Sequence, residues 1–341
     1  MTDTLLSLRE LRIGYSVGKN EVTAVDGASF DVAPGSVVGL VGESGCGKTT
    51  LARALTRVLA SNARITGGQA IFGGTDIMAL SEREMNRLRW RDIAFIPQSA
   101  MNSLDPVYTV GNQLREVLVK RGRLGRAAAR DRMVELFEWV GIEPGRLGDY
   151  PHQFSGGMRQ RVAIALALAL DPKLIIADEP VTALDVIVQR QILDQLKDLR
   201  DRLGISVILV THDISVVAYI CDRVVVMYAG KVVESGPMAA TLTDPAHPYT
   251  MGLRNAFPDL AGAAGELVPI HGAPPNLMFP PPGCRFAARC PFAQTRCAGA
   301  VPSLKDLGAE HLAACHRIEE RDALRAEALK AATWADMRGA A

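Results

Sequence analysis

The sequence predicts an α/β fold around a buried parallel sheet, and three apolar runs with one helical pattern carry that prediction. Residues 37–41, 174–177 and 205–210 are almost wholly aliphatic, as strands covered on both faces are. Between the last two, apolar residues recur at spacings of 4, 3 and 4 over residues 192–203, and Gly204 follows as a stop signal. Strands that alternate with amphipathic helices are typical of a parallel sheet.

A glycine-rich stretch follows the first of these strands and precedes a helical pattern: Gly42-Glu43-Ser44-Gly45-Cys46-Gly47-Lys48-Thr49-Thr50. Strand, glycine-rich turn and helix in this order predict a phosphate-binding P-loop, G-x-x-x-x-G-K-[ST]. Glycines allow the tight backbone whose N–H groups point at phosphate oxygens, and the helix N-terminus adds partial positive charge. We expect Lys48 to reach the β- and γ-phosphates of a nucleotide and Thr49 to bind Mg²⁺.

Composition limits the partners of the chain. Its 341 residues exceed one ordinary domain, which predicts a large core and an extension. Lys and Arg number 38 against 37 Asp and Glu, so no overall charge favours nucleic acid or anionic lipid. The longest apolar run, residues 162–170, is too short to span a bilayer, and the N-terminus does not resemble a signal peptide. We expect a soluble, cytosolic protein with any membrane role carried by a partner.

Strand patterns dominate the N-terminal part of the chain. Residues 5–41 show alternating apolar residues and turns, which predict an antiparallel β subdomain. A strand pair is predicted over residues 64–80, around Gly67-Gly68 and Gly73-Gly74. Residues 93–96 form a short apolar run that predicts another buried strand.

The remaining patterns divide the chain into a core and an extension. A helical subdomain is predicted at about residues 100–170, and a hairpin with its turn at residues 229–231 closes a core domain of residues 1–236. Proline clusters and four cysteines mark residues 237–341 as a small Cys/Pro-rich C-terminal extension, ending in a polar helix over 317–337.

Two adjacent carboxylates end the buried strand at residues 174–177. Asp178 lies where a carboxylate would hold Mg²⁺ through water. Glu179 is then placed to orient or deprotonate a water molecule for attack on the γ-phosphate. A helix-capping pair is the weaker interpretation, because two acids at a buried strand end are unfavourable without a cation.

Six features in this order resemble the nucleotide-binding subunits of ABC transporters, over residues 5–236. They are the P-loop, Gln98 of the Q-loop, the signature stretch Ser155-Gly156-Gly157 before a helix over residues 159–170, the acidic pair, the D-loop Ala183-Leu184-Asp185, and the switch histidine His212. The signature usually reads Leu-Ser-Gly-Gly-Gln, whereas Phe154 and Met158 replace its Leu and Gln here. Tyr15 matches the aromatic residue that stacks on adenine, although alone it would be taken for a half-buried strand residue.

This resemblance implies the roles of individual residues. Catalysis is implied for Lys48, Gln98, Glu179 and His212, and Mg²⁺ ligation for Thr49, Gln98 and Asp178. Contacts to ATP are implied for Tyr15, Gly42, Ser44, Gly45, Cys46, Gly47, Lys48, Thr49, Thr50, Gln98, Asp178, Ser155, Gly156, Gly157 and Asp185. Two such domains pair head to tail, so that the signature stretch of one completes the ATP site of the other.

A narrower resemblance is to the ATPase subunits of bacterial oligopeptide/dipeptide importers, a group that also includes nickel and some glycoside importers. It is carried by three stretches: Gln98-Ser99-Ala100-Met101-Asn102-Ser103-Leu104-Asp105-Pro106, residues 154–161, and His247-Pro248-Tyr249-Thr250. It implies a heterodimer with a second ATPase, two transmembrane permease subunits, an extracytoplasmic solute-binding protein, and a peripheral position on the cytoplasmic face of the bacterial plasma membrane. The Phe154 and Met158 variants are usual in one of the two ATPases.

The six cysteines fall into two groups. Cys46 and Cys221 are most simply small apolar fillers, although the Lys48 charge and the helix N-terminus would lower the pKa of Cys46. Cys284, Cys290, Cys297 and Cys315 are separated by 5, 6 and 17 residues, wider than the usual zinc pairs. The resemblance to peptide importers implies a [4Fe–4S] cluster on these four, with a zinc staple as the alternative. We expect this cluster to be structural, without touching ATP chemistry.

Two other classes of function compete with transport. A soluble ABC ATPase acting on nucleic acid or ribosomes generally has two cassettes or a long coiled coil, and this chain has one cassette and no basic patch. An ATP-binding regulator without hydrolysis would have lost Glu179 or His212, and both are present.

Overall fold

The computed structural model describes residues 4–98, 100, 103–182, 184–256 and 269–335. It divides into two compact units, each built from separate stretches of the chain. The phosphate-loop unit comprises Thr4–Val32, Val38–Met78 and the chain from Thr211 onward. The carboxylate unit comprises Ala33–Val37 and Ala79–Val210. Ala183 of the predicted D-loop lies outside the described residues, as do Ser99, Met101 and Asn102 of the importer-like stretch at residues 98–106.

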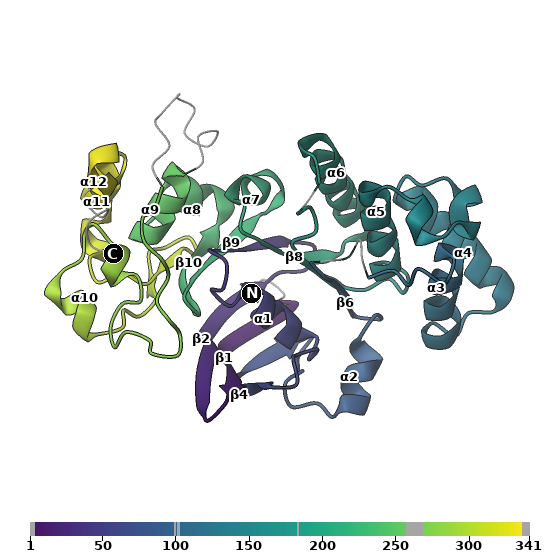
Figure 1. Cartoon of the computed structure of the whole chain (residues 1–341), viewed down its shortest axis with the longest axis horizontal. Coiled ribbons are helices and arrows are strands. Elements are labelled where there is room, and N and C mark those ends of the chain that lie inside the picture. The colour runs from purple at the N-terminus through teal and green to yellow at the C-terminus, as the bar shows by residue number, and fades with distance from the viewer. Residues whose placement is uncertain (1–3, 99, 101–102, 183, 257–268, 336–341) are drawn as a thin grey trace. The chain divides into compact units, whose positions relative to one another are not determined.

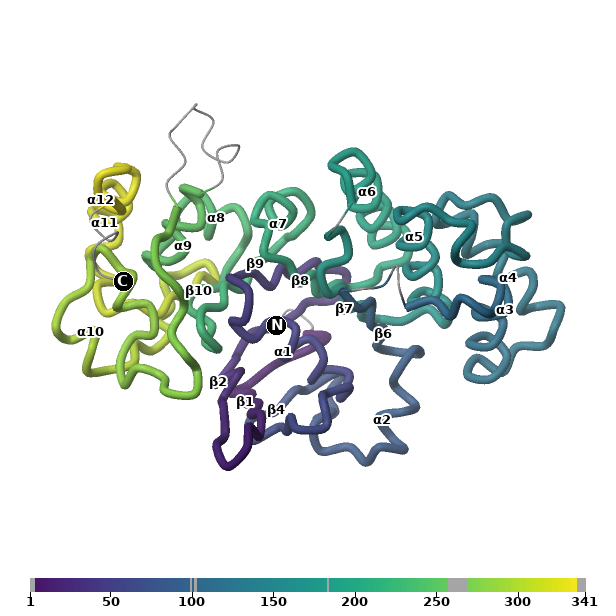
Figure 2. Tube along the Cα trace, viewed as in Figure 1, coloured from purple at the N-terminus to yellow at the C-terminus, as the bar shows by residue number. Residues whose placement is uncertain are grey.

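An antiparallel sheet opens the phosphate-loop unit, as predicted, with the order β2-β1-β4-β5. Its strands, of which β1, β2 and β4 lie side by side in Figure 2, are β1 (Leu6–Val17), β2 (Asn20–Val32), β4 (Ala63–Phe72) and β5 (Thr75–Asp76). Gly73-Gly74 forms the predicted turn between β4 and β5. Gly67-Gly68 does not form a turn: it lies inside β4, at the shift in register opposite Arg9–Arg12. Gly68 has φ +80°, and a Cβ there would lie 2.2 Å from the Glu10 carbonyl oxygen.

The same unit contains the strand that leads into the phosphate loop. Strands follow the order β11-β12-β10-β9-β3, with β3 parallel to β9 and the other pairs antiparallel. Their bounds are β3 (Val37–Val41), β9 (Arg223–Tyr228), β10 (Lys231–Pro237), β11 (Lys305–Asp306) and β12 (Leu312–Ala313). Helix α1 (Lys48–Leu55) follows the loop, and α7 (Ile214–Ile220), α8 (Met238–Thr243) and α9 (Pro248–Asn255) come later (Figure 1). Every residue of β3 is buried, and the predicted hairpin turn at Ala229–Gly230 is confirmed.

The extension packs within the phosphate-loop unit, and the predicted domain boundary at residue 236 stays a prediction. Its short helices are η6 (Ala287–Arg289), α10 (Thr295–Gly299), η7 (Ile318–Glu320), α11 (Arg321–Ala328) and α12 (Ala331–Ala335). The prediction of one continuous helix over residues 317–337 was therefore wrong for residues 317–335, and residues 336 and 337 lie outside the described residues. The helix ends at Ala328, whose carbonyl oxygen accepts hydrogen bonds from Trp334 at 2.8 Å and Asn255 at 2.5 Å. Burial of the apolar Trp334 ring overrides the helical pattern, since only 1% of it is exposed.

The carboxylate unit combines three parallel strands with helices, in the order β8-β7-β6. The strands are β6 (Ile93–Ile96), β7 (Leu174–Asp178) and β8 (Ser206–Thr211). The helices are α2 (Glu82–Leu88), α3 (Val110–Glu116), the π-helical turn η2 (Val117–Arg121), α4 (Arg126–Trp139), the 3₁₀ turns η3 (Pro144–Gly148) and η4 (Pro151–Gln153), α5 (Gly156–Ala167) and α6 (Val186–Leu203). Helices are present as predicted between residues 100 and 170, with α3, α4 and α5 packed together (Figure 1), and the bounds of the helical subdomain stay a prediction. Gly204 ends α6 at φ +66°, as predicted.

Candidate functional site

The phosphate loop has the backbone that its glycines predict. Gly42 has φ +150°, and a Cβ there would lie 2.1 Å from the carbonyl oxygen of Met227. Gly47 caps α1 with φ +102°, and a Cβ there would lie 2.3 Å from the carbonyl oxygen of Ala24. Both positions therefore require glycine, because neighbouring strand backbones close in on the loop.

Lys48 is folded back onto its own loop. Its Nζ donates hydrogen bonds to the carbonyl oxygens of Gly42 at 2.6 Å and Glu43 at 2.9 Å, and lies 3.7 Å from the Cys46 sulfur. Only 5% of the residue is exposed. The ammonium is thus held at the loop by oxygen acceptors, which phosphate oxygens can replace.

Four other predicted contacts lie in the phosphate loop or in the first turn of α1 (Lys48–Leu55). Thr49 and Thr50 are half-buried in its first turn, while Ser44 and Gly45 are exposed in the loop. The Tyr15 hydroxyl lies 3.0 Å from the Thr50 hydroxyl oxygen, so the predicted adenine-stacking residue is anchored to this helix. His212 is exposed between β8 and α7.

Two residues that the sequence analysis did not assign to the site hold the loop at Glu43. The Glu43 N–H donates to the Tyr249 hydroxyl at 2.9 Å. The Glu43 carboxylate accepts two hydrogen bonds from Arg289, at 2.7 and 2.9 Å. The extension therefore contacts the phosphate loop, which the motifs did not predict, and the expectation that the cluster does not touch ATP chemistry stays a prediction. The sequence held a partial signal: Tyr249 stands in one of the three stretches that resemble peptide importers, and Arg289 directly precedes Cys290 of the four-cysteine segment.

The environment of Cys46 overturns the expected effect of the Lys48 charge. Burial raises the pKa of the Cys46 thiol, and this outweighs the lowering by the nearby ammonium. Only 2% of the residue is exposed. Cys46 is therefore a buried thiol that favours the filler interpretation, and Cys221 is likewise buried.

The predicted acidic pair and Gln98 come together in the carboxylate unit. Asp178 is the last residue of β7 and is fully buried. Glu179 follows with φ +49°, a left-handed conformation that is unfavourable without glycine. Its Oε2 accepts hydrogen bonds from Gln98 Nε2 at 2.7 Å and from the Thr182 hydroxyl at 3.2 Å. These two hydrogen bonds orient the carboxylate so that it can accept a proton from a neighbouring group. The motifs did not predict the contact with Thr182.

The signature stretch forms the start of α5. The helix begins at Gly156, earlier than predicted, because the Ser155 hydroxyl caps it by accepting the Met158 N–H at 3.3 Å. Ser155 is exposed, and its hydroxyl and the first N–H groups of a helix together suit an anion. A Cβ at Gly157 would lie 2.6 Å from Val188 Cγ1, so a side chain there would displace Val188 where α5 meets α6.

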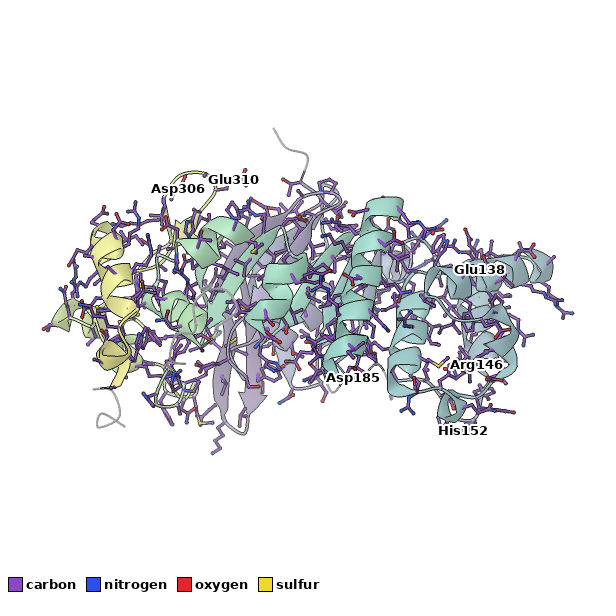
Figure 3. The ribbon with its side chains drawn as sticks, turned by 90° about the horizontal axis from the view of Figure 1, so that it is seen from above. Glu138, Arg146, His152, Asp185, Asp306 and Glu310 are labelled. Atoms are coloured by element: carbon purple, nitrogen blue, oxygen red, sulfur yellow. The ribbon has the colours of Figure 1, made fainter. Side chains whose placement is uncertain are left out.

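The two departures from the usual signature share one partner. The Arg146 guanidinium lies 4.4 Å over the Phe154 ring, and its Nη1 lies 3.3 Å from the Met158 sulfur. Arg146 also pairs with Asp149 at 2.7 Å and donates to the Gln153 carbonyl oxygen at 2.9 Å. Figure 3 labels Arg146 of η3 and His152 of the following turn, η4. Phe and Met therefore complete a local packing arrangement.

An exposed apolar patch adjoins the D-loop aspartate. Asp185 caps α6 through its carboxylate, which accepts the Val188 N–H at 2.9 Å (Figure 3). The next two residues, Val186 and Ile187, are 80% and 72% exposed. Large apolar side chains exposed side by side in this way are typical of an interface.

The four cysteines of the extension converge on one small cavity. Its lining includes Cys284, Cys290, Cys297 and Cys315. Burial and neighbouring thiols raise the pKa of Cys290, and they raise that of Cys315 to about 11. Within the described ranges, no set of three or more His, Cys, Asp or Glu side chains is arranged to hold a single metal ion. The metal prediction on these cysteines thus stays a prediction.

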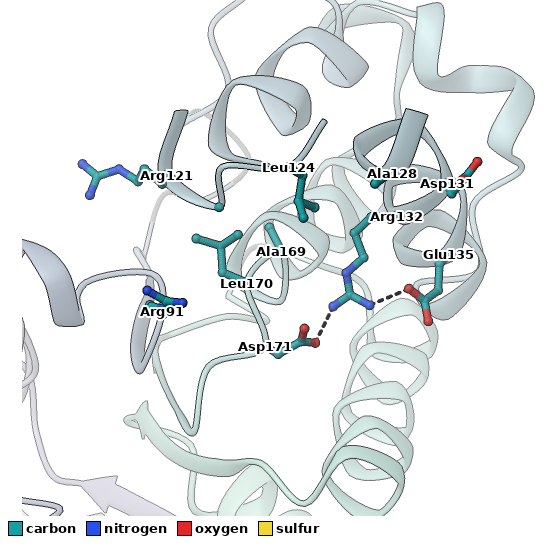
Figure 4. Close-up of a pocket in the computed structure, with 11 residues that line it drawn as sticks. Arg91, Arg121, Leu124, Ala128, Asp131, Arg132, Glu135, Ala169, Leu170 and Asp171 are labelled. Carbon is teal, nitrogen blue, oxygen red and sulfur yellow. Dashed lines mark hydrogen bonds and ion pairs between the residues drawn. The ribbon is translucent and has the colours of Figure 1, made fainter. Parts of the chain in front are cut away.

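A separate pocket of about 650 Å³ lies among the helices of the carboxylate unit (Figure 4). Arg132 crosses it and pairs with Glu135 at 2.6 Å and with Asp171. None of the residues that line this pocket belongs to the predicted ATP site. Among the residues that the structure describes, no helix has the length and hydrophobicity needed to cross a bilayer.

Comparisons with known proteins agree with both the motifs and the extension. Residues 25–182 match the ABC transporter family, and residues 233–297 match the C-terminal region of oligopeptide/dipeptide transporters. The chain is 44% identical over 322 residues to the dipeptide transport ATP-binding protein DppD of Bacillus subtilis, covering 94% of this chain and 96% of that protein. It is 45% identical over 321 residues to the oligopeptide transport ATP-binding protein OppD of Escherichia coli, covering 93% and 95%.

A solved structure supports the fold. The dimeric post-hydrolysis state of the ATP-binding cassette MJ0796, bound to ADP and Pi, superposes with a TM-score of 0.62 at 28% identity. The match covers 68% of this chain and 98% of that one. The predicted ABC-type P-loop core is thereby confirmed.

Proposed function

This chain belongs to the ABC transporter family of ATP-binding proteins, in the branch with an oligopeptide/dipeptide transporter C-terminal region, and we propose that it hydrolyses ATP to power the import of di- or oligopeptides. The observation that carries this proposal is the hydrogen bond from Gln98 to Glu179 beside the buried Asp178, in a chain that also contains a complete phosphate loop. A protein that only bound ATP would need the phosphate loop, but it would not need a carboxylate oriented as a base.

ATP is proposed to bind first through its phosphates. The Lys48 ammonium exchanges the loop carbonyl oxygens for β- and γ-phosphate oxygens, and Tyr15 stacks on adenine. Thr49, Gln98 and Asp178 would hold Mg²⁺, which when bound offsets the negative charge on the phosphates. A fully buried carboxylate at a strand end, as at Asp178, fits such a cation site.

Hydrolysis then depends on Glu179. Its carboxylate accepts a proton from water while the water oxygen bonds to the γ-phosphorus and the bond to the β–γ bridging oxygen breaks. Gln98 and Thr182 keep the carboxylate oriented during this step. His212 is proposed to contact the γ-phosphate.

A second, homologous ATPase subunit is the proposed partner at the signature stretch. Exposed Ser155, at the N-terminus of α5, would bind the γ-phosphate of the partner's ATP together with the Gly156 and Gly157 N–H groups. The exposed Val186 and Ile187 beside Asp185 supply the apolar area that such an interface buries.

Two permease subunits are proposed to hold the chain at the cytoplasmic face of the plasma membrane, with a solute-binding protein outside. Val107 and Tyr108, which follow the Q-loop, are 73% and 57% exposed. Exposed apolar residues at this position suit contact with a membrane subunit. They would transmit a change in the position of Gln98 to that subunit.

The shared-site proposal is tested by turnover. Purified alone at high dilution, the chain should hydrolyse ATP slowly, and adding the second ATPase and the permeases should raise the rate. Ser155→Ala should reduce this activation while leaving the chain's own ATP affinity unchanged. An isolated chain as fast as the complex would contradict the shared site. Stimulation by a peptide-loaded binding protein, and not by nickel or a glycoside, tests the substrate class.

The four cysteines are proposed to hold one [4Fe–4S] cluster, which matches four thiolate ligands. The shared cavity supports this proposal. Thiols with raised pKa values, such as Cys290 and Cys315, ionise readily only beside a cation.

Anaerobic purification tests the cluster. The protein should be brown, with iron and acid-labile sulfide near four each per chain, as this cluster type requires. Cys290→Ser should bleach it and expose the extension to protease. Stoichiometric zinc without iron, in protein never exposed to oxygen, would replace the cluster by a zinc staple.

A further inference from the structure

Given the ATP-dependent function proposed above, we infer that Arg289 of the extension is a positioning residue for the phosphate loop, so that ATP affinity depends on the fold of the four-cysteine segment. Arg289 donates from Nη1 to Glu43 Oε2 at 2.7 Å and from Nη2 to Oε1 at 2.9 Å. The two residues stand 246 positions apart in the sequence. Such a two-pronged ion pair fixes orientation as well as distance.

Glu43 is also held through its backbone. Its N–H donates to the hydroxyl of Tyr249, a fully buried residue of α9, at 2.9 Å. Its carbonyl oxygen accepts from Lys48 Nζ at 2.9 Å. One residue therefore connects the extension to the ammonium that is proposed to bind the phosphates. If Glu43 moves, the resting position of Lys48 moves with it.

Arg289 is itself fixed by its surroundings. Only 7% of it is exposed. Its remaining hydrogen bonds run to the carbonyl oxygens of His271 at 2.9 Å and Ile270 at 3.2 Å, and to the Tyr228 hydroxyl at 3.1 Å. Taking a guanidinium out of water adds little net stability even when it is well paired. The arrangement therefore favours a role in positioning.

A second arginine of the segment contacts strands that pack against the loop. Arg285 donates to Asp26 at 2.6 Å and to the carbonyl oxygen of Ala229. The neighbouring Gly230 N–H donates to the Cys46 carbonyl oxygen at 2.9 Å. The extension thus contacts Glu43 of the loop directly and supports the loop at Cys46 through the β9–β10 turn.

Both arginines are neighbours of cavity-lining cysteines. Arg285 follows Cys284, and Arg289 precedes Cys290. Opening the cysteine cavity would withdraw both arginines from their partners. The Glu43 carboxylate would then stand uncompensated in a loop that binds a triphosphate, and its negative charge would oppose ATP.

The test uses the assembled transporter with its permeases and second ATPase. Arg289→Ala should raise the KM for ATP about tenfold or more, because a buried partner of a charge is lost, while kcat stays within about twofold. Glu43→Ala should raise KM by a smaller factor. The double variant should resemble Glu43→Ala alone, because removing Glu43 also removes the uncompensated carboxylate that opposes ATP in Arg289→Ala.

Two variants separate positioning from a general effect on folding. Arg296→Ala is the matched control: Arg296 precedes Cys297 in the same way, but it lies 3.9 Å from Glu320 at the surface and should leave KM unchanged. Arg289→Lys keeps the positive charge but lacks the paired N–H groups of the guanidinium, so it should give a KM between those of the wild type and Arg289→Ala.

Several results would overturn the inference. One is an unchanged KM in a folded Arg289→Ala transporter, and another is a double variant whose KM rises by the product of the single effects. If Arg289→Ala does not assemble, Glu43→Ala decides, because it leaves the extension intact: a raised KM supports positioning and a wild-type KM rejects it. Failure of the unaltered complex to hydrolyse ATP would instead contradict the proposed function.

Discussion

Two glutamates follow buried strands in this chain, and they are held in different ways. Glu43, in the phosphate loop after β3, is paired with the Arg289 guanidinium from the extension. Glu179, directly after β7, accepts hydrogen bonds from an amide and a hydroxyl of its own unit. A guanidinium offsets the charge of a carboxylate, whereas neutral donors orient a carboxylate that remains available to a proton. One glutamate is thus suited to hold a loop and the other to act on water.

The backbone conformations of the phosphate loop and of Glu179 also differ. The phosphate loop places glycine where φ is positive, at Gly42 and Gly47, so its conformation is free of side-chain strain. Glu179 adopts φ +49° with a full side chain, which costs about 1–3 kcal/mol. Its N–H donates to the Val210 carbonyl oxygen at 2.8 Å, and this bond helps to maintain the conformation. Strain is thus placed at the proposed hydrolytic residue and not at the binding loop.

The largest expected effect separates the two glutamates by function. Glu179→Gln keeps the shape of the side chain but removes the base, so hydrolysis in the complex should fall about 10²–10⁴-fold. ATP binding should persist, because the phosphate loop is unaltered. Single-turnover hydrolysis and nucleotide binding measure the two effects. Near-normal hydrolysis by the variant would reject Glu179 as the base.

A smaller effect is expected in the signature stretch. Arg146→Ala removes the cation over Phe154 and the contacts to Met158 and Asp149, which should destabilise this segment by about 1–2 kcal/mol. Hydrogen exchange over residues 144–158 should rise, and partner-stimulated turnover should fall, while ATP binding by the isolated chain stays the same. Lost binding would show that Arg146 acts on the phosphate loop as well.

A finer test addresses the orientation of the base. Thr182→Ala removes one hydrogen bond to Glu179, worth about 1 kcal/mol, so kcat should fall severalfold without a change in KM. Thr182→Ser keeps the hydroxyl and serves as the control. Equal losses in both variants would point to packing of the methyl group in place of the hydrogen bond.

The smallest effect is expected at Cys46. Because burial raises the pKa of its thiol, the thiolate fraction at pH 7 lies below that of an ordinary cysteine and grows as pH rises. Alkylation followed by mass spectrometry should therefore be slow at pH 7 and faster at higher pH. Cys46→Ala should leave turnover within about twofold, since it is a conservative change at a filler. Rapid alkylation at neutral pH with loss of turnover would restore the reactive-thiol interpretation.

The sequence by itself determined the elements whose signals are local. The P-loop, the stop of α6 at Gly204 and the hairpin at Ala229–Gly230 depend on residues a few positions apart, and the structure confirms all three. The order of the motifs also assigned the acidic pair and Gln98 to one site, and in the structure Gln98 does contact Glu179. Local sequence could not predict that the helix ends at Ala328, where burial of Trp334 outweighs the helical periodicity.

Only the tertiary structure decided which distant groups meet. It placed Arg289 on Glu43, and it placed Phe154 and Met158 on Arg146. It also reversed the expected pKa shift of Cys46, because burial acts on a thiol more strongly than a neighbouring charge does here. Burial and charge pairing depend on which parts of the chain pack together, so neither can be obtained from the spacing of residues along the sequence.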